Sequence, residues 1–133
     1  MAVTTKAVYA GDFRVELTHG PTGGIILTDL PVDNGGQGRG FSPTDLFAAS
    51  LASCILTIMA KAVSSDGVDL AGASIAVEKT MREKPRMIAS FSGTIRLPAG
   101  LSDKARAKVL ACVEACPVHR SLHPDIKVDL KVE

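Results

Sequence analysis

The three cysteines of this 133-residue chain are the side chains whose chemistry depends most on their surroundings. Cys112 and Cys116 lie four residues apart, directly before Pro117, and Cys54 lies about sixty residues earlier. A metal site, a redox pair and the buried face of a helix can each contain cysteines at such a spacing. The reactivity of each cysteine therefore has to be judged from the element that carries it.

Cys54 and Cys116 belong to different helix environments. Cys54 is expected in the middle of a long apolar helix, where free cysteine commonly packs as a small hydrophobe and gains little from the helix dipole. If Cys54 reacts, a cation must come from elsewhere, and Arg14 and Arg39 are the candidates. Cys116 ends a second helix, where the dipole disfavours a thiolate, so it suits a second attack on a sulfur that is already oxidised.

A zinc site is an alternative for the second cysteine pair, because Cys112, Cys116, His119 and His123 form the pattern C-x3-C-x2-H-x3-H. On an unbroken helix the first and last of these would be about 16 Å apart along the axis, too far for one tetrahedral ion. A chain reversal at Pro117 would be needed to bring them together. For Cys112, packing in the core is the favoured interpretation.

The segment 42–67 carries the strongest helix signal. Ser42 is an N-cap residue, Pro43 suits the first turn, Asp45 occupies the capping-box position and Gly67 ends the run. No charge occurs between Leu46 and Ala60, so the helix is apolar nearly all round. A membrane span needs about 20 such residues, so we expect a buried helix, partly covered by a second subunit, and no membrane partner.

The other elements follow from short β-branched runs and their turn residues. Strands are expected over residues 2–10, 13–19 and 25–30 as an antiparallel meander, followed by a glycine-rich loop over 31–41. A hairpin of strands over 72–85 and 86–98 is expected to turn near residues 83–86. A capped helix over 102–116, about one further turn over 118–122 and a closing strand over 125–133 complete the chain.

The composition limits the class of protein. The length suits a single domain spanning 1–133. The net charge of +1, with both signs scattered, excludes an electrostatic footprint for nucleic acid. The first residues show neither a basic segment nor a long apolar one, so no signal peptide is expected. We therefore expect three cytoplasmic thiols that are reactive or inert rather than structural.

Two motifs together resemble the OsmC/Ohr family of thiol-dependent hydroperoxide reductases. They are "SPTDLFAASLASC" and, about sixty residues later, "CPVHRSL". The segments "PVDNGGQGRGFSPTDL" and "SCILTIM" are most similar to the OsmC-like branch. The resemblance implies an α+β fold with an antiparallel sheet and two long central helices. It also implies an intertwined homodimer whose active sites lie at the subunit interface.

The same resemblance implies the roles of the site residues. Cys54 would be the peroxidatic thiol and Cys116 the resolving thiol, in an enzyme without a metal or another cofactor. The family's arginine lies on an early strand or in the loop before the central helix, which matches Arg14 or Arg39. Such enzymes cleave organic hydroperoxides to alcohols, and a dithiol, a lipoyl group in some members, reduces the resulting disulfide.

This sequence departs from the Ohr branch at one position, since Thr44 stands where that branch has a glutamate that pairs with the arginine. Asp45 follows, but nine residues at about 100° each put it opposite Cys54 on the helix, which favours a capping role. Glu16, Asp33 or a residue of the other subunit are the remaining carboxylate candidates. The rival to a peroxidase is a non-catalytic dimer that serves as a small-ligand or stress-response binding module.

Overall fold

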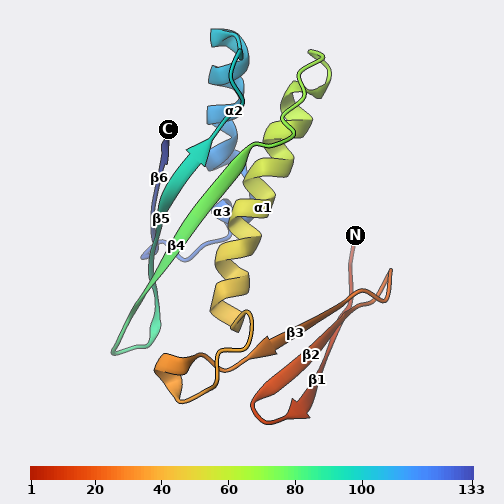
Figure 1. The fold of residues 1–133 in the computed structure, drawn as a ribbon, viewed down its shortest axis with the longest axis vertical. Coiled ribbons are helices and arrows are strands. Elements are labelled where there is room, and N and C mark those ends of the chain that lie inside the picture. The colour runs from red at the N-terminus through yellow and green to blue at the C-terminus, as the bar shows by residue number, and fades with distance from the viewer. The chain divides into compact units, whose positions relative to one another are not determined.

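Three antiparallel strands, in the order β1-β2-β3, open the computed structural model, which describes residues 1–133 (Figure 1). They are β1 (Thr5–Gly11), β2 (Arg14–His19) and β3 (Ile25–Asp29). The expected meander is thus confirmed. The strands belong to one of two compact units, Met1–Leu46, and the other unit is Phe47–Glu133. The expected single domain over 1–133 stays a prediction.

The sheet of the first unit leaves its large apolar side chains exposed. The unit's buried residues are polar, namely Thr28, Asp29 and Ser42. Its exposed large apolar residues are Met1, Val3, Val8, Tyr9, Phe13, Ile25, Ile26, Leu27, Val32 and Phe41. A small sheet needs an apolar face packed on another element for stability. The exposed apolar residues of the first unit therefore have the composition of a surface that packs against other protein.

The glycine-rich loop, which follows β3 in the sequence, is tightly folded. It contains the 3-10 helix η1 (Val32–Asn34), and the backbone N–H groups of Gly36 and Gly38 donate to the carbonyls of Pro31 and Leu30. A Cβ atom at Gly36 would lie 2.0 Å from the Leu30 carbonyl oxygen, so this close approach requires glycine. The loop thereby brings Arg39 back to the end of β3.

The second unit contains a mixed sheet in the order β4-β5-β6. Strands β4 (Ser74–Arg82) and β5 (Met87–Arg96) form the expected antiparallel hairpin, and β6 (Lys127–Val132) pairs with β5 in parallel. The α+β class is confirmed, but the expected antiparallel sheet is two sheets, one of them with a parallel pair. The parallel pairing arises because the helical segment between β5 and β6 crosses over the sheet.

Three helices complete the fold: α1 (Pro43–Ser64), α2 (Asp103–Ala115) and α3 (Pro117–Arg120). At the start of α1, the Ser42 hydroxyl accepts from the Asp45 N–H at 3.1 Å, and the Asp45 carboxylate accepts from the Ser42 N–H at 2.9 Å. This confirms the predicted capping box. Ser102 caps α2 in the same way, its hydroxyl accepting from the Ala105 N–H.

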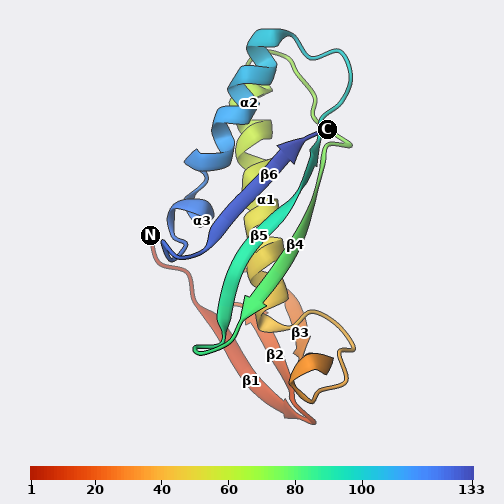
Figure 2. The ribbon, with the colours of Figure 1, turned by 90° about the vertical axis from the view of Figure 1, so that its left-hand side faces the viewer.

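The core of the second unit lies between its sheet and helices α1 and α2, which cover one face of the sheet (Figures 1 and 2). Helix α1 contributes residues at helical spacing, namely Ala48, Leu51, Ile55, Met59 and Val63. Its opposite side, with Ser50, Ser53, Thr57 and Ala60, is exposed. By length and a mean hydropathy of 1.9, α1 is also long and apolar enough to cross a membrane, although its buried stripe is that of a core helix packed on one side.

Candidate active site

The structure brings Cys54 and Cys116 together. Cys54 lies in α1, Cys116 lies between α2 and α3, and the Cys54 side chain is near enough to Cys116 to raise the pKa of its thiol. All three cysteines are free thiols. Two cysteines that are 62 residues apart in the sequence are therefore neighbours in the folded chain.

Packing positions each sulfur differently. Cys54 follows the buried Leu51 by one turn, is half-buried and packs against the core. Cys116 is fully buried, and it is at once the C-cap of α2 and the N-cap of α3. Pro117 occupies the first position of α3, so the helix restarts rather than continues. Within the pair, Cys54 is the thiol that a substrate reaches more easily.

The pKa of the Cys116 thiol is raised. Burial is the main cause, and the interaction with the neighbouring Cys54 thiol adds to it. The His119 N–H, 3.5 Å from the sulfur, acts in the opposite direction but is outweighed. Cys116 is therefore a poor first nucleophile, as the sequence suggested, but for another reason. The sulfur also faces the N-terminus of α3, so burial and not the dipole of α2 is decisive.

The C-x3-C-x2-H-x3-H pattern does not converge on one point. The Cys112 thiol lies in the core, donates to the Lys108 carbonyl at 3.4 Å and has its pKa raised by burial. His123 accepts the Asp125 N–H on its Nδ1 atom. No group of three or more potential ligand side chains could hold a metal ion. The favoured interpretation of Cys112 as a core residue agrees with this packing.

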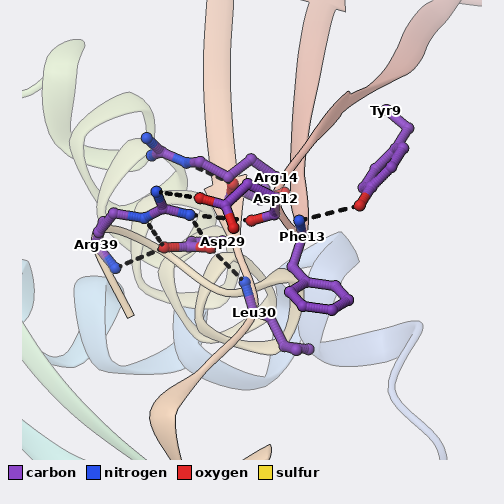
Figure 3. Close-up of polar contacts among 8 residues, drawn as sticks. Tyr9, Asp12, Phe13, Arg14, Asp29, Leu30 and Arg39 are labelled. Carbon is purple, nitrogen blue, oxygen red and sulfur yellow. Dashed lines mark hydrogen bonds and ion pairs between the residues drawn. The ribbon is translucent and has the colours of Figure 1, made fainter. Parts of the chain in front are cut away.

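An ion-pair network occupies the first unit, built around Arg39 (Figure 3). The Arg39 guanidinium donates to Asp29 from Nε at 2.7 Å and from Nη2 at 3.2 Å. It donates to the Asp12 carboxylate from Nη1 at 2.9 Å and to the Asp12 carbonyl from Nη2 at 3.0 Å. Arg39 thus joins the turn between β1 and β2 to the end of β3.

The Asp29 carboxylate is the buried anchor of this network. Its side chain has no exposed surface and it accepts four hydrogen bonds, including those from the Leu30 and Arg39 N–H groups. Hydrogen bonds from the Arg39 side chain and backbone hold the pKa of Asp29 well below its ordinary value. The pKa of Arg39 is raised in turn by Asp29. The charge of Arg39 is therefore compensated within its own unit.

Arg14 differs from Arg39 in having no carboxylate partner. It is half-buried at the start of β2, and its one hydrogen bond runs from Nε to the Thr28 carbonyl at 3.4 Å. Glu16, on the same face of β2, is exposed and forms no ion pair with it. Arg14 is therefore the early arginine whose positive charge is available to a ligand or a thiolate.

The other predicted carboxylates lie elsewhere in the first unit. Asp45 belongs to the capping box of α1, and Asp33 lies in η1. The carboxylates that hold Arg39, Asp12 and Asp29, were not among the candidates. A turn aspartate and an aspartate at a strand end are common in any sequence, so no local signal distinguished them.

The chain belongs to the OsmC-like protein family, whose model matches residues 36–131. A crystallised protein from Psychrobacter arcticus, provisionally described as an osmotic stress induced and detoxification response protein, is 38% identical, with a TM-score of 0.93. That alignment covers 100% of this chain and 97% of the other. No curated protein matches the sequence significantly.

More distant structures share the fold. An organic hydroperoxide resistance protein OsmC from Legionella pneumophila is 24% identical, with a TM-score of 0.76, over 100% of this chain and 97% of that chain. The organic hydroperoxide resistance protein OhrB of Bacillus subtilis is 18% identical, with a TM-score of 0.69, over 100% and 98%. The OsmC/Ohr resemblance inferred from the two motifs is thus confirmed.

Proposed function

We propose that this protein is a thiol-dependent peroxidase that reduces organic hydroperoxides to alcohols, with Cys54 as the peroxidatic thiol and Cys116 as the resolving thiol. The observation that carries the proposal is the proximity of two free thiols of unequal burial. The half-buried Cys54 is accessible to a peroxide, whereas Cys116 is buried and its raised pKa keeps it protonated. Membership of a family with named hydroperoxide resistance proteins supports the same chemistry.

The proposed reaction has three steps. The Cys54 thiolate attacks the peroxide, an S–O bond forms and the O–O bond breaks, and the departing alkoxide takes a proton and leaves as the alcohol. Cys116 then attacks the Cys54 sulfenic acid, which forms a disulfide and releases water. An external dithiol supplies two electrons and two protons to restore both thiols. No metal or cofactor takes part in these steps.

Arg14 is the cation that we assign to the peroxidatic site. A guanidinium keeps its charge at any physiological pH and offers several donors, so it can both hold a thiolate and orient a peroxide oxygen. Arg39 is less suited to this role because Asp29 and Asp12 already occupy its donors. With Thr44 at the position of the Ohr glutamate, Arg14 acts without that carboxylate.

The working form in this proposal is a cytoplasmic homodimer. The exposed apolar side chains of the first unit and the exposed side of α1 are surfaces that a second copy would cover. Burial of the uncharged side of α1 against protein would also explain its composition without a membrane.

The test is titration of free thiols on the intact protein after one equivalent of cumene hydroperoxide. Two thiols should be lost together in the wild type and in Cys112→Ser, which removes the thiol that lies in the core. Cys54→Ser should stop the loss. Equal loss of thiols in Cys54→Ser would refute the peroxidase assignment and favour the alternative, a non-catalytic OsmC-fold dimer that binds a small ligand.

A further inference from the structure

The turn between β1 and β2 has an unfavourable backbone conformation. Gly11, Asp12 and Phe13 all have positive φ angles, of 86°, 54° and 62°. A side chain with a Cβ atom disfavours this left-handed region, and a bulky one such as Phe disfavours it most. Two-residue hairpin turns of this kind usually carry Asn-Gly or Asp-Gly, so contacts outside the turn must stabilise Asp12 and Phe13 here.

Those contacts converge from three directions on the turn (Figure 3). The Arg39 guanidinium donates to both the carboxylate and the carbonyl of Asp12. The Phe13 N–H donates to the Tyr9 hydroxyl at 3.1 Å, and the Phe13 carbonyl accepts from the Leu30 N–H at 3.2 Å. Of these, the two Arg39 bonds are the charge-assisted contacts, which are the stronger kind.

Arg39 is itself fixed by Asp29, whose side chain is buried and fully hydrogen-bonded. The next residue after the turn is Arg14, which pairs in register with both Gly11 and Asp29. Apart from the strand pairing, Arg14 is held by one long hydrogen bond to the Thr28 carbonyl. The direction in which β2 starts, and hence the direction of the Arg14 side chain, therefore depends on the turn.

We propose that Arg39 is a positioning residue that acts through Arg14. Anchored on Asp29, it holds the left-handed Gly11–Phe13 turn, which sets the orientation of the uncompensated Arg14 guanidinium. This inference rests on the proposed peroxidase function for its kinetic readout. It assigns different roles to the two early arginines, one as the cation of the thiol site and the other as the support of its orientation.

A double-mutant cycle on the full-length protein tests this division of roles. With cumene hydroperoxide, Arg14→Gln should lower kcat/KM by about 100-fold, the usual effect of removing one preorganised electrostatic contact. Arg39→Gln should lower kcat/KM by about tenfold, because the Arg14 guanidinium would still be present but displaced from its best position. In the Arg14→Gln background, Arg39→Gln should have no further effect beyond about twofold. Additive losses would overturn the proposal.

A rescue variant separates positioning from general stability. Phe13→Gly creates the Asp-Gly pair that this turn prefers, and Phe13 is 61% exposed, so little packing is lost. In the Arg39→Gln background it should restore most of the lost kcat/KM, and in the wild-type background it should change the rate by less than about twofold. A folded double variant without rescue would contradict the proposal. If Arg39→Gln does not fold, Asp12→Asn, which keeps the Asp29–Arg39 pair, enters the same cycle.

Amide hydrogen exchange gives a readout that needs no activity. Arg39→Gln should speed exchange at the Phe13 and Leu30 amides, which are bonded across the turn, while the amides of β5 keep wild-type rates. Unchanged exchange rates at both the Phe13 and the Leu30 amide would also overturn the proposal. If the wild type reduces no hydroperoxide, the proposed function fails, whereas faster exchange would still show that Arg39 holds the turn.

Discussion

The two units of this protein hold their reactive groups in opposite ways. In the first unit, the buried Asp29 is ionised and each of its oxygens is hydrogen-bonded, mainly by Arg39. In the second, burial raises the pKa of the Cys116 thiol, which lies near the Cys54 thiol and stays neutral. A buried charge is tolerated only with partners that satisfy it, whereas a buried thiol is tolerated without ionising. The Asp29 carboxylate therefore has a structural role, whereas the proposed mechanism gives the neutral Cys116 thiol a later reaction.

The two units also differ in how many apolar side chains they bury. The second unit packs Phe91, Leu51 and Ile55 with no exposed surface, whereas the first buries no apolar side chain. Stability in the second unit therefore rests on its own core. In the first unit it rests on the sheet, on the Arg39 network and on whatever covers the exposed apolar residues.

The largest effect is expected from Cys116→Ser, which leaves Cys54 as the one thiol of the proposed site. Disulfide formation should be abolished, because Cys116 is the resolving thiol in the proposed mechanism. The first oxidation by cumene hydroperoxide should still proceed, and a Cys54 sulfenic acid should accumulate. Dimedone labelling with intact mass spectrometry measures this species. A normal disulfide in Cys116→Ser would mean that Cys112 can resolve Cys54.

Phe91→Ala should be the most destabilising change in the core. Phe91 is fully buried and its ring stacks on Phe47 with centroids 6.1 Å apart. A cavity of this size costs about 3–5 kcal/mol of unfolding free energy, measurable by urea denaturation. Glu78→Ala, on the exposed face of β4, is the matched control and should stay within about 0.5 kcal/mol. Similar losses in both variants would contradict the assigned core.

Asp29→Asn should lower the melting temperature by several degrees and weaken its dependence on acid pH. The pKa of Asp29 is lower in the folded state than in the unfolded state. Its contribution is therefore complete above the ordinary carboxyl pKa of about 4 and is lost as pH falls towards the folded value. Thermal scans from pH 7 down to about 2 should show a shallower decline in the variant.

The control for this prediction is Asp66→Asn. Hydrogen bonding to Lys108 also lowers the pKa of Asp66, so the sign of the pH effect is the same. Both side chains of that pair are more than 40% exposed, and exposed ion pairs contribute little. An equal effect at both positions would mean that the Asp29–Arg39 pair is no more than a surface contact.

The smallest effect is expected from Cys112→Ala. Cys112 lies in the core and its thiol bonds within its own helix, so the loss should be about 1 kcal/mol of unfolding free energy. The rate of Cys54 oxidation should not change. A slower rate, measured by stopped flow with the same peroxide, would show that Cys112 shares in the chemistry.

Much of the local structure could be predicted because the signals are local. The capping box of Ser42 and Asp45, the cap at Ser102 and the hairpin turn at 83–86 depend on residues within a few positions of one another. The parallel direction of β6 was missed because a strand's own residues do not specify its neighbour. The choice of Cys54 came from the family motifs alone, because its position in the middle of a helix argued against reactivity. Cys116 was chosen from the same motifs and from its position at a helix end, and both roles stay predictions.

By itself, the sequence determined the elements, their caps and the unequal character of the cysteines, since these follow from propensities and spacing along the chain. Only the tertiary structure decided that Cys116 lies near Cys54 and that Arg39, rather than Arg14, is held by carboxylates. Both outcomes join residues distant in sequence, Cys54 with Cys116 and Arg39 with Asp12. Such pairs form when packing brings elements together, and burial then determines which group keeps its charge.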